Sequence, residues 1–125
     1  MKILLVDDDQ GYLNVMADIL RQHGHEVLLA ENGKQARESI EFDKVDLIIS
    51  DVFMPTLDGA RFHNYVREFT DLHDIPFIFI SGYDDENTRK LVLDPSKDFF
   101  FSKTTPIDTL MGFIAGLKQK TQVGQ

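Results

Sequence analysis

A chain of 125 residues with 42% hydrophobic and 27% charged residues has the size and composition of one soluble globular domain with a buried core. Its formal net charge of −8 argues against the cationic surface on which direct nucleic-acid binding depends, so no nucleic-acid partner is expected. No apolar run approaches the ~20 residues that span a bilayer, and no cysteine is present for a disulfide or a thiolate metal site, which favours a cytoplasmic protein without a membrane partner.

Five short apolar runs are predicted to be strands, and each is near-continuously hydrophobic, as in parallel sheets that are covered on both faces. In chain order these runs are Ile3–Val6, Val27–Ala30, Leu47–Ser50, Phe77–Ser81 and Phe99–Ser102. Apolar residues at helical spacing predict four helices, in segments around positions 13–20, 36–40, 62–69 and 107–117. A weaker pattern over Glu86–Leu93 predicts a short helix before the fifth strand.

This alternation of strands and helices predicts an α/β fold in which helices cover both faces of a parallel sheet. We divide the chain into a folded domain over residues 1–118 and a polar C-terminal tail or linker stump over residues 119–125. Ligands of such sheets bind beyond the carboxyl ends of the strands. The residues that follow each strand are therefore the candidates for a functional site.

Polar side chains stand at four of the five predicted strand ends. Asp7 and Asp8 follow the first strand, Asp51 follows the third, Ser81 closes the fourth, and Lys103 follows the fifth. Each has a simpler explanation as a helix cap, a turn residue or a solvated charge. Together, three mutually repelling carboxylates would be stabilised by Mg²⁺ (or Mn²⁺), and a hydroxyl and an ammonium would bind further anionic oxygens. The set favours transfer of a phosphoryl group to a carboxylate.

Five segments resemble the receiver domain of bacterial two-component response regulators in order and spacing. They are KILLVDDD (2–9), GHEVLLAENGKQA (24–36), DLIISDVFMPTLDG (46–59), IPFIFISGYDD (75–85) and FFFSK (99–103). The resemblance implies a chemotaxis-regulator-like, flavodoxin-like fold, that is, a doubly wound (βα)5 three-layer sandwich with a five-stranded parallel sheet of order 2-1-3-4-5. It implies a signalling phosphoacceptor rather than an enzyme, with only self-catalysed phosphotransfer and autodephosphorylation.

Carried over position by position, the resemblance implies that Asp51 becomes an aspartyl phosphate. The donor would be a phosphohistidine of a histidine kinase or a histidine phosphotransfer protein. Asp7 and Asp8, with Asp51 and the backbone carbonyl of Phe53, would bind Mg²⁺. We expect Asp51 to be ionised at neutral pH, since an ordinary aspartate titrates near ~4.

The same resemblance implies a phosphorylation switch. Ser81 and Lys103 would bind the phosphoryl oxygens, and Ser81 would move toward them. Phe100, three residues before Lys103, would then pack inward. This change would reshape the face formed by helix 4, strand 5 and helix 5, which a downstream effector protein would bind.

The sequence departs from the family pattern after Lys103 and before the fifth strand, where Ser96 and Lys97 replace a usual Gly-Ala pair. Thr104 follows Lys103, where the family commonly has a proline after a cis bond. A cis bond before a non-proline residue costs ~3–4 kcal/mol, so we expect this bond to be trans or strained. Pro95 predicts that the fourth helix ends early, because the residue before a proline is pushed from helical angles.

Two bulky residues are expected to tune the lifetime of the phosphate. In the family, the positions two beyond the phosphoacceptor and two beyond the hydroxyl flank the path of the hydrolytic water. Here they are Phe53 and Tyr83, which predicts comparatively slow loss of phosphate. The alternative is that both are surface aromatics with no kinetic role.

Three alternatives to a stand-alone receiver remain. The first is an N-terminal receiver cut from a longer DNA-binding regulator. The second is a small haloacid-dehalogenase-like phosphatase with Asp7 as nucleophile, which the Asp-x-Asp in LLVDDDQG suggests but which Gln10 and Gly11 fit poorly and which leaves Asp51 without a role. The third, a flavin-binding module, lacks a Ser/Thr/Gly-rich phosphate loop after the first strand.

Overall fold

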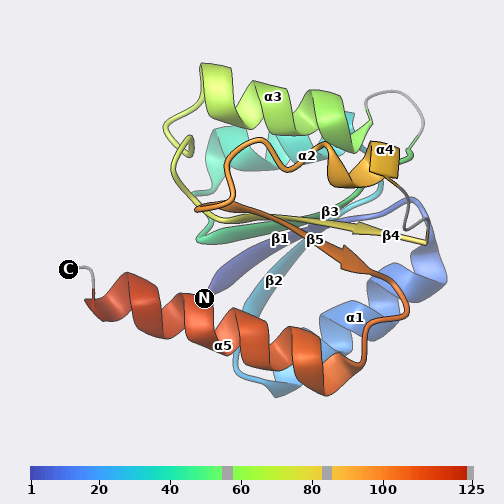
Figure 1. The fold of residues 1–125 in the computed structure, drawn as a ribbon, viewed down its shortest axis with the longest axis vertical. Helices are drawn as coiled ribbons and strands as arrows, with labels where there is room; N and C mark the ends of the chain where they lie inside the picture. The colour runs from blue at the N-terminus through green and yellow to red at the C-terminus, as the bar shows by residue number, and fades with distance from the viewer. Residues whose placement is uncertain (55–57, 83–85, 124–125) are drawn as a thin grey trace.

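The computed structural model describes residues 1–54, 58–82 and 86–123, with side chains as far as residue 118. Within these residues five strands alternate with five helices (Figure 1). The strands are β1 (Lys2–Val6), β2 (Glu26–Ala30), β3 (Leu47–Asp51), β4 (Phe77–Ser81) and β5 (Asp98–Ser102). The helices are α1 (Gln10–Gln22), α2 (Gly33–Phe42), α3 (Gly59–Phe69), α4 (Glu86–Arg89) and α5 (Ile107–Val123).

The strands form one parallel sheet in the order β2-β1-β3-β4-β5, which confirms the predicted doubly wound α/β fold. Helices α1 and α5 cover one face of the sheet, and α2, α3 and α4 cover the other, so the molecule has three layers (Figure 1). The strand order reverses at β1, which lies between β2 and β3. Ligands of such sheets bind beyond the carboxyl ends of the strands at the point of reversal.

Two apolar clusters, one on each face of the sheet, hold the helices against it. There are two because successive residues of a strand face opposite sides. Ile3 and Leu5 of β1 belong to the cluster that contains Ile114 of α5. Leu4, between them, belongs to the cluster that contains Phe62 of α3. All five side chains are completely buried, and each contributes about 1.5–3 kcal/mol relative to an exposed position. Burial on both faces explains the near-continuous hydrophobic runs of the sequence.

Three helices begin at a side chain that accepts a hydrogen bond from the first helical turn. Asp9 caps α1 by accepting the N–H of Tyr12 at 3.2 Å. Asn32 and Asp58 cap α2 and α3 in the same way, at 2.8 and 2.9 Å. Such caps contribute about 1 kcal/mol each. Because Asp9 is the cap of α1, the carboxylate of Asp8 is left for the end of the sheet.

Helix α4 is shorter than the pattern over Glu86–Leu93 suggested, because it ends at Arg89. The prediction that it ends before Pro95 is confirmed. After Arg89 the backbone continues as turns, in which the N–H groups of Leu91 and Val92 bond to carbonyls three residues earlier. The proline restricts its own backbone and that of Asp94, so it does not account for the end of the helix at Arg89.

Helix α5 continues to Val123, so the helical backbone includes residues 119–123 of the predicted tail. The division into a domain over 1–118 and a tail or linker stump stays a prediction. In the described part of the chain, no helix has both the length and the apolar character that crossing a bilayer requires.

Candidate functional site

The carboxyl ends of four strands carry the side chains that the sequence marked as a site. Asp7 follows β1, Asp51 ends β3, Ser81 ends β4, and Lys103 follows β5. Lys103 Nζ lies 2.8 Å from Asp7 Oδ2 and 3.5 Å from Asp51 Oδ2. Three strand ends therefore form one charged cluster, in which an ammonium faces two carboxylates.

Asp51 is buried at the end of β3, with 7% of its surface exposed. Its Oδ1 accepts a hydrogen bond from the N–H of Val52 at 2.8 Å. Burial and, next, the charge of Asp7 raise the pKa of Asp51 to about 6, although Lys103 and the Val52 N–H act in the opposite direction. The expectation of an ordinary aspartate was wrong, because the degree of burial depends on the fold. At neutral pH Asp51 is nevertheless mostly ionised.

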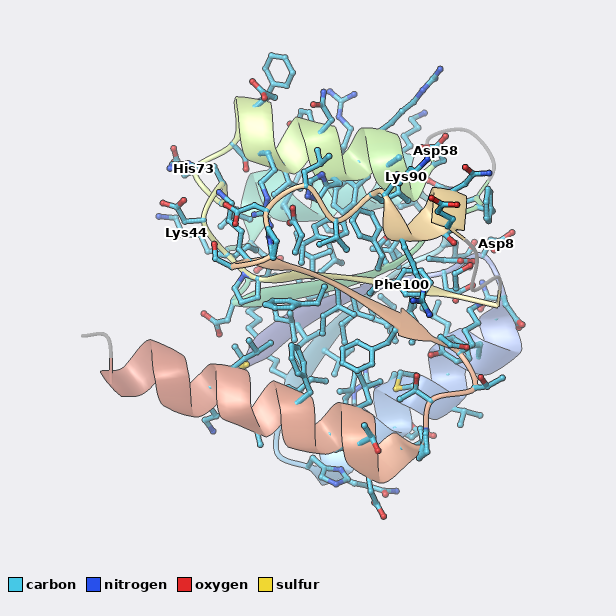
Figure 2. All side chains as sticks on the ribbon, viewed as in Figure 1. Asp8, Lys44, Asp58, His73, Lys90 and Phe100 are labelled. Atoms are coloured by element: carbon cyan, nitrogen blue, oxygen red, sulfur yellow. The ribbon has the colours of Figure 1, made fainter. Side chains whose placement is uncertain are left out.

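Asp7, Asp8 and Asp51 form a cluster that fits a divalent cation. Each offers one carboxylate oxygen, and the three oxygens lie within 4.8 Å of one another. Asp7 is completely buried and its Oδ1 accepts the N–H of Asp9 at 2.9 Å. Asp8 is exposed at the end of the sheet (Figure 2). An oxygen-only donor set with excess negative charge suits Mg²⁺.

The turn after β5 positions Lys103. Its N–H donates to the carbonyl of Ser81 at 2.8 Å. Ser102, Thr104 and Thr105 close the turn with hydrogen bonds among themselves. The described chain contains no cis peptide bond, so the bond between Lys103 and Thr104 is trans, one of the two outcomes expected from the sequence. Lys103 reaches the carboxylates without a following proline.

The Lys103 ammonium is enclosed between the carboxylates and an aromatic ring. Burial lowers the pKa of Lys103, but its hydrogen bond to Asp7 and its attraction to Asp51 raise the pKa above its ordinary value overall. On another side, the ring centroid of Tyr12 lies 4.6 Å from Nζ. The pKa of Tyr12 is itself raised, first by burial and then by Asp7 and Asp51. Sequence reasoning missed Tyr12, although an aromatic in the first turn of a helix that begins at the site was a usable signal.

The two predicted switch residues lie on neighbouring strands. Ser81 is completely buried at the end of β4, in register with Ser102 of β5. Phe100 is half-buried on β5, and it packs against the apolar cluster on the side of the sheet that α4 covers (Figure 2). It lines a cavity of about 440 Å³ together with Arg89 of α4. The roles of Ser81 and Phe100 stay predictions.

Gly59 allows α3 to begin directly against the end of β3. Its N–H donates to the carbonyl of Val52 at 2.9 Å. A Cβ at this position would overlap the carbonyl oxygen of Asp51 and lie 3.1 Å from its carbonyl carbon. The glycine therefore lets the amino end of α3 lie against the backbone of Asp51.

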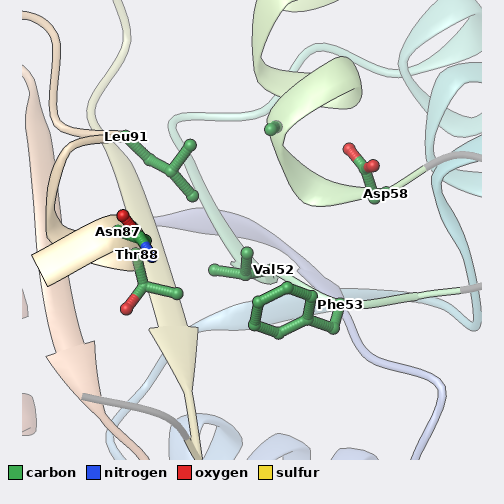
Figure 3. Close-up of a pocket in the computed structure, with 7 residues that line it drawn as sticks. Val52, Phe53, Asp58, Asn87, Thr88 and Leu91 are labelled. Carbon is green, nitrogen blue, oxygen red and sulfur yellow. The ribbon is translucent and has the colours of Figure 1, made fainter. Parts of the chain in front are cut away.

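A cavity of about 350 Å³ lies beside the site, between the segment after β3 and helix α4. Its walls are Val52, Phe53, Asp58, Ala60, Asn87, Thr88 and Leu91 (Figure 3). Phe53 is 56% exposed, and its ring lies along this cavity. Tyr83, the other residue predicted to shield the phosphate, lies outside the described residues.

A buried polar cluster, which sequence reasoning also missed, lies where β5 begins. His63 Nε2 of α3 is 2.8 Å from Asp98 Oδ1, and Arg67 of α3 reaches the same oxygen at 2.6 Å. The side chain of Asp98 is completely buried. Although burial acts to raise the pKa of Asp98, the hydrogen bonds from Arg67 and His63 lower it overall. The charges lie far apart in sequence, so no local pattern signals them.

Comparison with known proteins gives consistent results along the chain. A family model described as the response regulator receiver domain matches residues 3–115. Response regulator MprA of Mycobacterium leprae (strain TN) is 31% identical over 122 residues, which cover 98% of this chain and 53% of that protein. The chain thus spans about half the length of the curated relatives that it matches.

Solved structures agree with the fold. A two-component response regulator from Clostridium difficile superposes with a TM-score of 0.87 over 97% of this chain and 98% of its own. At 21% sequence identity, this comparison supports the fold alone. The response regulator protein TrrA from Thermotoga maritima, in complex with Mg²⁺-BeF, has a TM-score of 0.80 and 26% identity, over 93% of this chain and 97% of its own.

Proposed function

The chain belongs to the response regulator receiver domain family of two-component signalling, and from this we propose that Asp51 is its phosphoacceptor. One observation carries the proposal most strongly, namely that Lys103 Nζ lies 3.5 Å from Asp51 Oδ2 while it also contacts the buried Asp7. This arrangement supports the proposal, because a phosphoryl group that is transferred to Asp51 would have a cation beside it to offset the charge on its oxygens. The family assignment gives no support to the dehalogenase-like phosphatase or to the flavin module.

In the proposed reaction, Oδ2 of Asp51 attacks the phosphorus of a phosphohistidine. The new O–P bond forms as the P–N bond breaks, and the electron pair of that bond remains on the donor imidazole. Val52 holds Oδ1 through its N–H, which leaves Oδ2 as the oxygen nearer the ammonium. Lys103 offsets the negative charge that gathers on the phosphoryl oxygens, and the hydroxyl of Ser81 donates to one of them.

We propose that Asp7, Asp8, Asp51 and the backbone carbonyl of Phe53 hold Mg²⁺ (or Mn²⁺). When bound, the metal ion neutralises charge on the carboxylates and on the phosphoryl group. The carboxylate oxygens within 4.8 Å of one another support this proposal, as does TrrA, whose structure contains Mg²⁺-BeF. Asp7 and Asp51 supply the buried ligands, and Asp8 supplies the exposed one.

The proposed partners are a histidine kinase or histidine phosphotransfer protein upstream and an effector protein downstream. The effector would bind the face of α4, β5 and α5, where Phe100 lines a cavity of about 440 Å³. Both a stand-alone receiver and the N-terminal receiver of a longer regulator are compatible with this site, and the curated relatives, of which the chain matches about half, are longer response regulators.

A direct test is incubation of the protein with acetyl phosphate and Mg²⁺. We expect the mass of one phosphoryl group to be added, and borohydride trapping with peptide mapping to locate it on Asp51. EDTA should prevent the addition. Substitution of an exposed aspartate of α1, Asp18→Asn, serves as the control and should not change the result. Label on Asp7 would support the phosphatase, and bound flavin without label would support the flavin module.

Phe53 is proposed to slow hydrolysis of the aspartyl phosphate by shielding the phosphorus from water. We expect Phe53→Asn to lose phosphate severalfold faster than the wild type. The control is Phe69→Asn, which alters a phenylalanine that is 72% exposed at the end of α3. The measurement is the decay of the phosphorylated mass after removal of the donor. Equal decay in the wild type and in Phe53→Asn would show that the ring has no kinetic role.

A further inference from the structure

We propose that Tyr12 is a positioning residue that holds the ammonium of Lys103 in place for phosphoryl transfer. This inference rests on the proposed function of Asp51 and adds a residue of α1 to it. Tyr12 would act through its ring face, without contact with the phosphoryl group. It would restrict where the lysine can place its charge, and so keep that charge beside the nucleophile.

The geometry around Lys103 Nζ carries the inference. Asp7 Oδ2 is 2.8 Å away and Asp51 Oδ2 is 3.5 Å away, while the ring centroid of Tyr12 is 4.6 Å away. The negative face of an aromatic ring attracts a cation within about 6 Å, and the attraction strengthens as water is excluded. The lysine side chain is 22% exposed, so the ammonium has lost most of its contact with water.

A lysine needs such a restraint more than most cations do. Its ammonium is a point charge at the end of a flexible four-carbon stem with rotatable donors. Its backbone is held through the N–H bond to Ser81 and through the turn at Thr104 and Thr105, but these bonds do not restrain the stem, so the place of the ammonium depends on its own contacts. The Tyr12 ring, whose centroid lies 4.6 Å from Nζ, limits the positions that the ammonium can take.

The position of Tyr12 is set by α1 and by packing. Its N–H donates to Asp9 Oδ1 at 3.2 Å, and its ring packs against the apolar cluster between the sheet and helices α1 and α5. Its hydroxyl is buried and has no hydrogen-bond partner among the described residues. The hydroxyl therefore does not hold the ring, and a phenylalanine should place the same ring face against Lys103.

The test compares Tyr12→Phe, which keeps the ring, with Tyr12→Leu, which removes it. The matched control is Tyr65→Leu. The guanidinium of Arg37 on α2 lies 4.1 Å from the ring centroid of Tyr65 on α3, so this pair has a similar cation–ring contact away from the site. With Mg²⁺ and saturating phosphoramidate, we expect Tyr12→Leu to be phosphorylated about fivefold more slowly. Tyr12→Phe and Tyr65→Leu should react within about twofold of the wild type.

A second readout does not depend on phosphorylation. In protein labelled with ¹³C-lysine, the ring current of Tyr12 should shift the ε-methylene protons of Lys103 upfield of those of exposed lysines. Lys103→Arg would assign the signal. The shift should persist in Tyr12→Phe and disappear in Tyr12→Leu, and Tyr12→Met would replace a leucine variant that fails to fold.

The inference would be overturned if the wild-type Lys103 signal fell among those of exposed lysines, or if Tyr12→Leu were phosphorylated as fast as the wild type. It would also fail if Tyr12→Phe were as slow as Tyr12→Leu, since the hydroxyl would then be responsible. If the proposed function itself is wrong, the wild-type protein takes up no phosphate on Asp51, and this result differs from those that overturn the role of Tyr12.

Discussion

The Asp51→Asn protein is expected to take up no phosphate from acetyl phosphate and Mg²⁺, and yet to be more stable than the wild type in metal-free buffer at pH 7. The loss of phosphorylation follows from the loss of the carboxylate nucleophile. The gain in stability follows from electrostatics. Burial and the charge of Asp7 raise the pKa of Asp51 to about 6, so the fold disfavours the charged form of this residue.

The size of the gain follows from that shift. A rise in pKa from 3.8 to about 6 corresponds to about 3 kcal/mol, at roughly 1.4 kcal/mol per unit. That shift already includes the opposing attraction of Lys103, and the buried amide must itself be desolvated, so we expect a net increase of about 1–3 kcal/mol in the free energy of unfolding. Urea denaturation in EDTA measures this difference. Asp18→Asn, at an exposed position of α1, should leave stability unchanged within about 0.5 kcal/mol.

The dependence of this gain on pH has a definite sign. Because the folded-state pKa of Asp51 lies above the unfolded value of 3.8, the penalty of its charge is fully present above pH 6. The penalty shrinks as the pH falls through about 6 and disappears below about 4, where Asp51 is protonated in both states. Burial lowers the pKa of His63, but both proteins contain His63, so its contribution cancels. A difference in stability that stayed constant between pH 7 and 4 would contradict this account.

Asp98→Ala is expected to cause the largest loss of stability, about 3–5 kcal/mol. Removal of this buried carboxylate leaves the His63 imidazole, at 2.8 Å, without its acceptor, and it leaves the Arg67 guanidinium, at 2.6 Å, without its counter-charge and with backbone carbonyls as acceptors. It also removes the acceptor of the Asp94 N–H, at 3.1 Å. These bonds join α3 to the beginning of β5. The free energy of urea unfolding and the melting temperature measure the effect.

Two variants separate loss of the ion pair from loss of a side chain. Asp98→Asn retains an acceptor oxygen for Arg67 and His63 and should cost less than Asp98→Ala. Asp94→Ala removes a neighbouring carboxylate whose side chain is 46% exposed, and it should cost much less than Asp98→Ala. Folded Asp98→Asn should still be phosphorylated, since the cluster lies at the other end of β5 from Lys103. Asp98→Ala with wild-type stability would show that the cluster contributes little.

Much of the fold followed from patterns that are local in the sequence. The five apolar runs predicted the strands, because a strand covered on both faces excludes polar residues from its middle. The strand boundaries were less accurate. Strands β1 and β2 begin one residue earlier than predicted, at Lys2 and Glu26, because a backbone ladder extends through charged residues whose side chains reach water. The order of the strands came from the family resemblance.

The candidate site was predictable to the extent that it depends on strand ends. Parallel strands bring their carboxyl ends to one edge, so residues after different strands meet there whatever their separation in the sequence. Tyr12 and the cluster of His63, Arg67 and Asp98 were not predictable in this way. Their contacts depend on the direction of each side chain and on how closely a helix packs against the sheet, and neither follows from hydrophobic periodicity.

The sequence by itself determined the elements, their number among the described residues, and the identity of the charged groups at the strand ends. Only the tertiary structure decided how those groups act on one another. It buries Asp51 beside Asp7 and raises its pKa to about 6, and it places Lys103 between two carboxylates and the ring of Tyr12. The reason is that charge–charge energies depend on distance and on exclusion of water, which only the packed chain specifies.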